Sequence, residues 1–460
     1  MASVKELLAT PPAGQDVVVH GWVRTKRDSK GGFSFIEVND GSCFKSIQVV
    51  ADATLPNFTQ EVLKLNTGCS LEVKGKLVPS TGRGQAVEIQ TSRIEVVGWA
   101  DDSYPLQKKK HTFEFLREIA HLRSRSNTFG AIMRIRSGLA FAIHQFFQNK
   151  GFYYLTTPLI TASDCEGAGE LFQVTTLNLA QVPKINGAVD YRQDFFDIPV
   201  YLTVSGQLEG ELFACALGGI YTFGPTFRAE NSNTPRHLAE FWMVEPEVAF
   251  CDLNQDIALA TEFIKHLLQY VLDTYPDEMA FFDQFIEAGT SNVLREVIEK
   301  DFRILEYTET IHILQKAPVD FEYPVEWGKN LQAEHERYLT EQVFKCPVVV
   351  INFPRVIKPF YMYVNDDDKT VRGMDVLVPR IGELIGGSQR EHRLDVLLSR
   401  MEELGMNKDH YQWFIDLRRY GTVPHAGFGL GFERLLLLVT GMKNIRDVIP
   451  FPRTPGNAQF

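Results

Sequence analysis

The sequence predicts an α+β protein with two parts: a small β-barrel near the N-terminus and a larger domain in which strands and helices mix. Short segments rich in β-branched residues fill positions 17–98, whereas a helical spacing of apolar residues begins near position 126. The 460 residues suffice for about three domains of ~150 residues, or for two of unequal size. The composition, 44% hydrophobic and 23% charged, is that of a globular protein and excludes collagen, disorder and a simple coiled coil.

The barrel prediction depends on strand-like segments that are separated by turn signals. Glycine-containing turns fall at 30–32, 39–41 and 81–84. About five short strands within ~80 residues favour a small closed barrel, and the five-stranded oligonucleotide-binding (OB) barrel fits that number. We assign residues 1–100 to this domain. Its strand-like segments are 17–23, 33–38, 46–50, 70–75, 87–90 and 94–97.

Residues 101–125 are predicted to form a hinge, because they contain Pro105 and three consecutive lysines at 108–110. The second domain is assigned to 126–460. It opens with a long amphipathic helix that Ser126 caps and Gly151 ends. Apolar residues recur along this helix at spacings of three and four, at Ile132, Ile135, Leu139, Ile143 and Phe146.

The rest of the second domain alternates between strand and helix patterns. A polar region around 273–347 is predicted to be a helical, variable insertion. Strands are expected at 153–160, 220–228, 241–250, 348–353, 371–378 and 424–430, and helices at 253–274 and 431–440.

The charge is distributed unevenly along the chain. The formal net charge is −11, from 47 basic and 58 acidic residues. Residues 1–110 hold 14 basic and 12 acidic side chains, so they carry 14 − 12 = +2 and the remainder carries −13. A near-neutral first domain on an acidic body permits local contact with nucleic acid but argues against a DNA-coating protein.

The cysteines and the apolar segments indicate a cytoplasmic location. The six cysteines show no Cys-x-x-Cys spacing, which argues against zinc ribbons and dithiol motifs and favours a reducing compartment. The first residues lack the apolar core of a signal peptide. The longest uncharged apolar stretch, 212–227, is too short to span a membrane. We therefore expect a soluble protein with no membrane partner.

A polar loop at 227–237 lies between two predicted strands and carries candidate phosphate-binding groups. Arg228 and Glu230 lie on the same strand face, because side chains alternate along a strand. A guanidinium fork beside a carboxylate suits a phosphate oxygen and its metal ion. His237 adds a donor at the far end of the loop, and Phe241 offers a ring face for a base. The alternative is a surface hairpin with a salt bridge.

Two glycine-rich segments also suit a ligand. Residues 427–434 end a strand with alternating glycines and start a helix at Arg434, and small residues there let a polyphosphate approach the backbone. Residues 382–391 place Glu383 and Arg390 on either side of a glycine strip. A tight corner and a plain hairpin are the alternatives. The sequence contains no phosphate-binding loop, dinucleotide fingerprint, His-Glu-x-x-His motif or nucleophile elbow.

Taken in order, these segments resemble the class II aminoacyl-tRNA synthetases. Residues 151–158 after the long helix look like motif 1, the Phe-Arg-Ala-Glu loop looks like motif 2, and the segment ending in Arg434 looks like motif 3. Neither a HIGH nor a KMSKS sequence of the other synthetase class is present. The resemblance implies a catalytic domain with an antiparallel sheet flanked by helices. The N-terminal OB barrel implies the aspartate, asparagine and lysine branch.

Within this branch, residues 204–211 are similar to the amino-acid-binding strip of the aspartate and asparagine enzymes. Aspartate enzymes resemble Ser-Pro-Gln-Leu-Phe-Lys there, and this chain has Gly210 at the lysine position. Burying an unpaired substrate carboxylate is costly, whereas a neutral amide needs no cation, so the resemblance implies L-asparagine. A non-discriminating aspartyl-tRNA synthetase and a synthetase-like asparagine synthetase are the alternatives, although the latter would be expected to lack the barrel that this chain has. An RNA-binding module that uses only the barrel is argued against by Arg228, Glu383 and Arg434.

The resemblance also implies roles for individual residues. Arg228, Glu230 and Arg434 would be catalytic, with Mg²⁺ held by Glu230 and Glu383. The amino acid would contact Glu166, Gln207, Glu245 and Arg390. The ATP site would consist of Arg228, Glu230, His237, Phe241, Glu383 and Arg434.

The expected partners are tRNA(Asn) and a second copy of the chain, with no DNA. The homodimer would form as motif 1 helices pack across a two-fold axis, through the apolar stripe of the long helix. In the barrel, Phe35 and Gln48 match positions that read the central anticodon uridine, and Arg24 and Arg27 would face phosphates. An inward core position is the alternative for Phe35.

Overall fold

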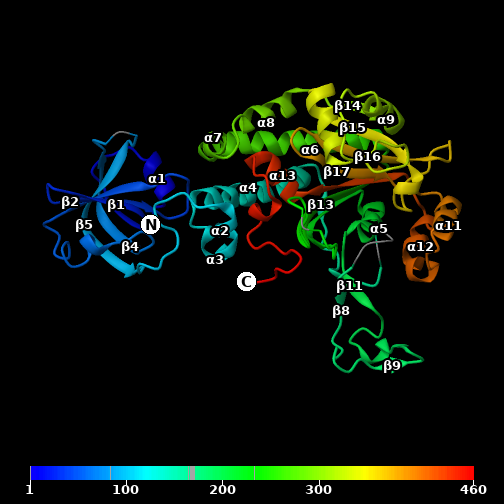
Figure 1. Cartoon of the computed structure of the whole chain (residues 1–460), viewed down its shortest axis with the longest axis horizontal. Coiled ribbons are helices and arrows are strands. Elements are labelled where there is room, and N and C mark those ends of the chain that lie inside the picture. Colours follow the sequence, from blue (N-terminus) through cyan, green and yellow to red (C-terminus); the bar gives the residue numbers. More distant parts are fainter. Residues whose placement is uncertain (1, 83, 164, 166–170, 233) are drawn as a thin grey trace. The chain divides into compact units, whose positions relative to one another are not determined.

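The first unit of the chain, residues 1–134, contains a closed five-stranded barrel (Figure 1). The structure is a computed structural model that describes residues 2–82, 84–163, 165, 171–232 and 234–460. The strand order is β1-β2-β3-β5-β4, which confirms the predicted OB barrel. The strands are β1 (Asp16–Ser29), β2 (Phe33–Asn39), β3 (Ile47–Asp52), β4 (Ser70–Pro79) and β5 (Val87–Gly98). The segments predicted at 87–90 and 94–97 are joined in the single strand β5.

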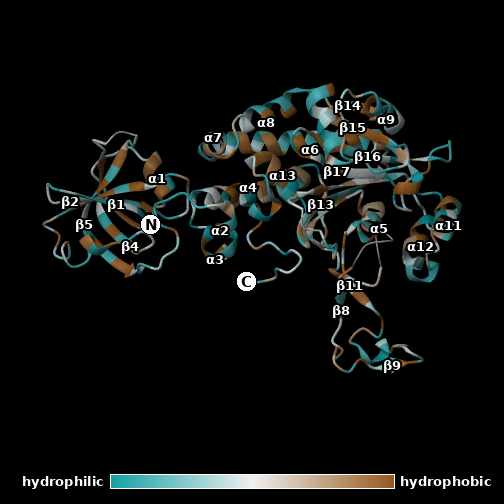
Figure 2. Ribbon diagram, viewed as in Figure 1, coloured by the Kyte–Doolittle hydropathy of each residue, from teal (hydrophilic) through white to brown (hydrophobic). Residues whose placement is uncertain are grey.

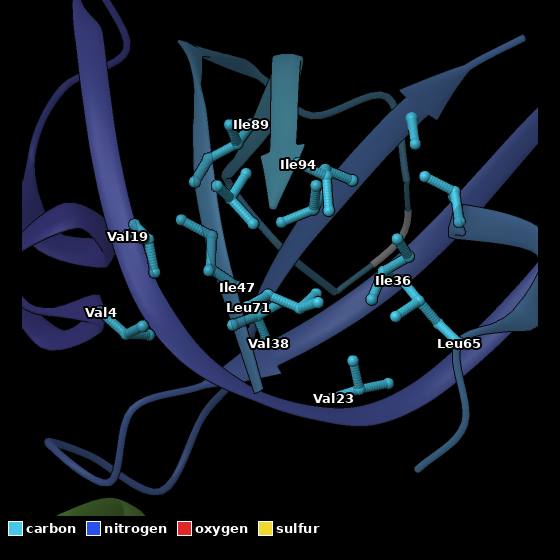
Figure 3. Packing of buried hydrophobic residues seen from close by; sticks show 14 of the residues in the cluster. Val4, Val19, Val23, Ile36, Val38, Ile47, Leu65, Leu71, Ile89 and Ile94 are labelled. Atoms are coloured by element: carbon cyan, nitrogen blue, oxygen red, sulfur yellow. The ribbon is translucent and has the colours of Figure 1, made fainter. Parts of the chain in front are cut away.

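Alternation of side chains builds the core of the barrel. Apolar residues of β1, β2, β3 and β5 converge inside it, among them Val19, Ile36, Ile47 and Ile89 (Figure 3). Along each strand the hydropathy alternates, as Figure 2 shows. The short helix α1 (Val4–Ala9) adds two apolar side chains to this core and starts with a capping box at Ser3.

The segment predicted as a hinge contains helical structure. It holds α2 (Phe113–Glu118) and α3 (Ala120–Arg123), which pack around a small cluster of Leu106, Leu116 and Phe129. The long helix α4 (Asn127–Asn149) follows, and Ser126 accepts a hydrogen bond from the amide of Phe129, 3.3 Å away, at its start.

The second unit, residues 135–460, is organised around an eight-stranded sheet (Figure 1). The six central strands are antiparallel, and the outermost strands β14 and β6 pair in parallel with their neighbours. The order is β14 (Arg303–Glu306), β15 (Val348–Pro354), β16 (Thr370–Val378), β17 (Gly382–Gln389), β18 (His425–Gly431), β13 (Glu240–Ala249), β12 (Gly219–Phe227) and β6 (Tyr153–Tyr154).

Two expectations differ from this sheet. The strand expected at 153–160 is reduced to the two residues of β6 and a separate β7 (Ile160–Thr161), because Pro158 lies within that segment and cannot donate to a ladder. The region around 273–347 is not only an appendage, since it supplies the edge strand β14.

Helices cover one face of the sheet. The ring of Phe147 on α4 stacks on Tyr221 of β12 with centroids 4.7 Å apart, and Phe263 on α6 (Leu253–Thr274) lies 6.1 Å from Phe428 of β18. Helix α13 (Phe432–Thr440) also packs on β13 and β18. Because side chains alternate along a strand, Thr222 and its cross-strand partner Glu245 point to the opposite face.

The remaining elements surround this framework. A three-stranded sheet is formed by β7, β11 (Val200–Leu202) and β8 (Gln173–Val174), and a hairpin by β9 (Lys184–Ile185) and β10 (Ala188–Val189). No helix within the described ranges has the length and apolarity needed to cross a membrane. The other helices are α5 (Gln207–Leu217), α7 (Pro276–Phe285), α8 (Thr290–Glu299), α9 (Tyr307–Gln315), α10 (Ala333–Arg337), α11 (Leu394–Glu403) and α12 (Gln412–Arg419).

Candidate active site

The open face of the sheet carries a cavity that the β12–β13 hairpin, β17, β18 and α13 line. Its floor exists because glycines occupy every second position of β18, so that Gly429 and Gly431 leave space where side chains would stand, while Phe428 points to the helices. A Cβ at Gly429 would lie 2.7 Å from the Met243 side chain. The glycine pattern therefore clears room for a ligand on the sheet itself.

All six residues predicted for the ATP site line this one cavity: Arg228, Glu230, His237, Phe241, Glu383 and Arg434. They come from the β12–β13 hairpin, from β17 and from the first turn of α13. The antiparallel register of β12 and β13 pairs Thr226 with Phe241, which brings the two ends of the polar loop together. The Arg228 guanidinium lies over the Phe241 ring, 5.4 Å from its centroid.

Arg434 and Glu383 form an ion pair inside the cavity. Nη1 of Arg434 donates to the Glu383 carboxylate at 3.0 Å and to its carbonyl oxygen at 3.1 Å. Burial favours a raised pKa for Glu383, but the charges of Arg434 and then Lys358 outweigh it and hold the pKa below its usual value. Glu383 is therefore ionised at neutral pH, as a cation ligand must be.

Two further carboxyl groups lie beside Glu383, and sequence reasoning missed both. A Cβ at Gly386 would stand 3.0 Å from Glu383 Oε1 and 3.7 Å from Asp375 Oδ1. Burial raises the pKa of Asp375 to about 6, against the opposing charge of Lys358. Burial, and then the charge of Glu383, raises the pKa of Glu336 to about 7. Asp375 lies on the preceding strand β16, outside the glycine strip, and Glu336 lies in the region taken as an insertion.

The carboxylates of the cavity suit Mg²⁺, which keeps water and phosphate ligands, better than a metal that protein side chains alone enclose. Across the described ranges, no three His, Cys, Asp or Glu side chains gather closely enough to enclose a metal. Mg²⁺ usually takes only one or two carboxylates together with water and substrate phosphates. Glu230 and Glu383, which line the same cavity, suit that mode.

His237 lies at the end of the cavity nearest the polar loop. The hydroxyl oxygens of Ser232 and Thr234 lie 3.0 and 2.5 Å from its Nδ1. Burial lowers the pKa of His237, and the guanidinium groups of the cavity add to this effect against the opposing charge of Glu230. The tautomer of the neutral ring that carries its proton on Nε2 can accept a hydroxyl hydrogen at Nδ1 and donate from Nε2 to a phosphate oxygen.

Glu245 and Gln207 lie beyond the cavity along the same face. Glu245 is buried and accepts hydrogen bonds from the Ser205 hydroxyl (2.5 Å), the Gly206 amide (3.1 Å) and the Thr222 hydroxyl (2.9 Å). Gln207, the first residue of α5, donates from Nε2 to Glu211 at 3.0 Å. Its amide oxygen is thereby oriented away from Glu211, where it can accept from an ammonium group.

Arg390 is held by a carboxylate that sequence reasoning did not single out. Its Nε and Nη2 donate to the two oxygens of Glu247, and its Nη1 donates to Ser388 at 2.7 Å. Glu247 lies two residues after Glu245 on β13 and so on the same face. Burial lowers the pKa of Arg390, but Glu247 outweighs it and the pKa lies above its usual value. Glu166, the fourth residue predicted for the amino acid, lies outside the described residues.

The predicted anticodon residues are all in the barrel. Phe35 is half-buried, alternates with the fully buried Ile36, and has the Arg27 guanidinium 5.2 Å from its ring centroid. Phe35 therefore lies on the outer face of β2. Gln48 donates to Glu88 at 2.9 Å. Arg24 donates to the carbonyl of Arg125 and to the side chain of Asn127, so its guanidinium is already engaged by the chain.

Two families match the sequence. The family of class II tRNA synthetases (D, K and N) matches residues 113–455, and the OB-fold nucleic acid binding domain matches residues 17–97. The fold is thus that of a class II tRNA synthetase with an N-terminal OB domain.

Relatives narrow the assignment within this class. The chain is 59% identical over 459 residues to an asparagine–tRNA ligase of Nostoc sp., and 58% identical over 457 residues to one of Geobacter sulfurreducens, with 99% of both chains covered in each case. The asparaginyl-tRNA synthetase of Pyrococcus horikoshii complexed with asparaginyl-adenylate has a TM-score of 0.85 at 33% identity, covering 96% of each chain. An aspartyl tRNA synthetase of Entamoeba histolytica, 23% identical with a TM-score of 0.79, shares the fold. The chain belongs to the asparagine–tRNA ligase family.

The environment of His237 predicts that the pKa of its imidazole lies below the ordinary value. Because burial and the neighbouring guanidinium groups disfavour the charged ring, the imidazole should titrate with a pKa below 6.5. The measurement is NMR of ¹³Cε1-labelled histidine in the ligand-free protein, with the signal assigned by its loss in His237→Gln. A midpoint at or above 6.5 would contradict the described surroundings of the ring.

Proposed function

We propose that this chain activates L-asparagine with ATP and transfers the asparaginyl group to the 3′ end of tRNA(Asn). The main support for this proposal is that all six side chains predicted to bind ATP line one cavity. Glu245 and Arg390 lie next to this cavity on the same sheet. The family membership supports the choice of amino acid. The free cysteines, Cys43, Cys69, Cys165, Cys215, Cys251 and Cys346, support a reducing, cytoplasmic setting.

The first step is a displacement at phosphorus. The asparagine carboxylate attacks the α-phosphorus of ATP, and pyrophosphate leaves as the adenylate forms. Arg228 would contact the α-phosphate and stabilise the charge of the transition state, while His237 and Arg434 would hold the outer phosphates. Phe241 would stack on the adenine. Mg²⁺ held by Glu230 and Glu383 would neutralise phosphate charge.

The second step needs no covalent enzyme intermediate. The terminal ribose hydroxyl of tRNA attacks the adenylate carbonyl, and AMP leaves. The side chains of the cavity position the reactants and stabilise charge, which is how catalysis proceeds without a protein nucleophile.

The hydrogen-bonding capacity that remains at Glu245 and Arg390 fits a carboxamide. A carboxylate accepts about four hydrogen bonds, and Glu245 already accepts three. A guanidinium has about five donors, and Arg390 already uses three. Glu245 would therefore accept from the asparagine side-chain nitrogen and Arg390 would donate to its oxygen. Gln207 would accept from the α-ammonium, together with Glu166.

The role of Arg228 predicts a kinetic signature. Arg228→Ala should lower the rate constant of adenylate formation by about a hundredfold or more, ~3 kcal/mol, because a donor to the transition state is lost. Asparagine binding should weaken far less, and Arg228→Lys should rescue poorly because lysine has no planar fork. Pyrophosphate exchange and single-turnover kinetics measure this. Near-normal exchange by the alanine variant would refute the role.

The pocket predicts how asparagine is separated from aspartate. An aspartate would set its side-chain carboxylate against Glu245, and like charges in a buried site repel. Glu245→Gln should therefore reduce exchange with asparagine while narrowing the preference for asparagine over aspartate. Equal losses for both amino acids would show instead that Glu245 serves the α-ammonium. Wild-type exchange with aspartate as efficient as with asparagine would favour the non-discriminating alternative.

The outer position of Phe35 predicts that the two units can be separated functionally. Phe35→Ala should weaken aminoacylation of tRNA(Asn) by ~1–3 kcal/mol, the cost of a lost stacked base, and leave tRNA-independent pyrophosphate exchange nearly intact. Ile36→Ala, which opens a cavity in the barrel core, is the matched control for destabilisation. If Phe35→Ala unfolds the barrel as Ile36→Ala does, Phe35 is a core residue.

We also propose a homodimer, with a surface that differs from the one expected. The stripe Ile132, Ile135, Leu139 and Ile143 is fully buried within the chain, so it is not free to contact a second copy. The stripe is therefore not the dimer surface that we expected. The exposed apolar residues at the β6 edge are the better candidates: Phe141 on α4 and Tyr153 and Tyr154 on β6, 61%, 56% and 44% exposed.

Light scattering at micromolar concentration should therefore give about twice the mass of one chain. Tyr153→Asp, which places a charge in the proposed interface, should shift the mass toward that of one chain, and Phe250→Asp on an exposed turn should not. A monomeric wild-type mass would refute the dimer.

A further inference from the structure

Glu383 lies at an irregularity in its strand. In the β16–β17 ladder, Val376 pairs with Ile385, but the next residue, Leu377, pairs with Glu383, so Leu384 is an extra residue on β17. Such a bulge interrupts the ladder and re-aims the neighbouring side chains. Its backbone groups then need other partners, because a buried peptide group without one is costly.

The amide of Glu383 finds its partner in α10. It donates to Glu336 Oε2 at 3.0 Å, and Glu336 is 8% exposed. Gly382 makes this approach feasible, because it has φ +83° and a Cβ there would lie 2.2 Å from the same oxygen. A glycine at positive φ and a buried carboxyl group thus fit each other beside the bulge.

The other side of Glu383 is held by Arg434, which binds both its carbonyl oxygen and its carboxylate. The peptide groups and the side chain of Glu383 are therefore fixed from two directions, by α10 and by α13. Glu336 itself does not line the ATP cavity. Its hydrogen bond to the Glu383 amide links it to the cavity, and its charge also acts on Arg434.

We propose that Glu336 is a positioning residue that fixes the backbone of Glu383, so that the Glu383 carboxylate is presented to the Mg²⁺ of ATP. The inference rests on the proposed function, since it takes Glu383 as a magnesium ligand. It gives the region around 273–347 a task in the chemistry, which its sequence does not reveal. Residues that orient a ligand of a metal typically affect metal affinity about 10–100-fold when they are replaced.

The test compares three variants of the full chain by Mn²⁺ binding, measured by electron paramagnetic resonance with a non-hydrolysable ATP analogue. Glu336→Met keeps the volume but removes the acceptor, and it should weaken Mn²⁺ binding about tenfold or more. Glu336→Gln keeps an acceptor oxygen, so its Mn²⁺ affinity should stay within about threefold of wild type, a smaller change than the tenfold or greater loss expected for Glu336→Met. Glu334→Ala is the matched control, since Glu334 on the same helix accepts the amides of Glu322 and Tyr323 but does not contact Glu383.

The kinetic readout should agree with the binding. In Glu336→Met the Mg²⁺ concentration for half-maximal pyrophosphate exchange should rise, while KM for asparagine stays unchanged. Wild-type Mn²⁺ affinity in a folded Glu336→Met variant, or a tenfold loss in Glu336→Gln, would overturn the proposal. If Glu336→Met does not fold, the Mn²⁺ affinity of Glu336→Ala is tested against the same expected loss. If neither variant folds, the Mn²⁺ affinity of Glu336→Gln decides. Failure of the wild type to catalyse asparagine-dependent exchange would instead refute the proposed function.

Discussion

The site depends on the alternation of side chains along the antiparallel strands β12, β13 and β18. This constraint gives the sheet two faces with opposite chemistry: Tyr221 and Phe428 pack under helices, while Thr222, Glu245 and the glycines of β18 face the open side. A shift of the register by one residue would exchange the two sets and bury the carboxylates among aromatic rings. The aromatic core thus fixes the register, and the register fixes the site.

The ion pair of Arg434 and Glu383 joins the two glycine-rich segments across this framework. Each segment alone is an ordinary structural element, a strand-to-helix corner or a hairpin. Paired, they place a cation and a carboxylate at fixed positions in one cavity. Arg136 on α4 supports the same corner through an ion pair with the buried Glu433, 2.7 Å away, so the motif 1 helix is tied to the start of α13. Glu433 also accepts from the Trp242 amide of β13 at 2.9 Å, which connects the polar-loop hairpin to the same corner.

The sequence was informative where the signal is local. Periodicity predicted α6 at its observed bounds. Short sequence motifs identified the six predicted ATP-site residues, and all six line the cavity. Residues whose role comes from contacts with neighbouring strands and helices were missed. Asp375, Glu247 and Glu336 carry no local pattern, because their meaning comes from contacts with Glu383 or Arg390. The facing of Phe35 also needed the structure, because apolar or aromatic residues stand at both alternating positions and only burial separates them.

The charge arrangement would explain why the proposed amino-acid pocket suits a neutral amide. Arg390 would attract an anionic side chain if it stood alone, but Glu247 already binds it through both oxygens. Gly210 supplies no compensating cation, and a Cβ there would lie 3.2 Å from Ile220 and 3.5 Å from the Glu247 side chain. The remaining acceptor capacity of Glu245 favours an N–H donor, and its negative charge would repel a carboxylate. Selectivity would thus come less from a group added for asparagine than from the removal of free positive charge.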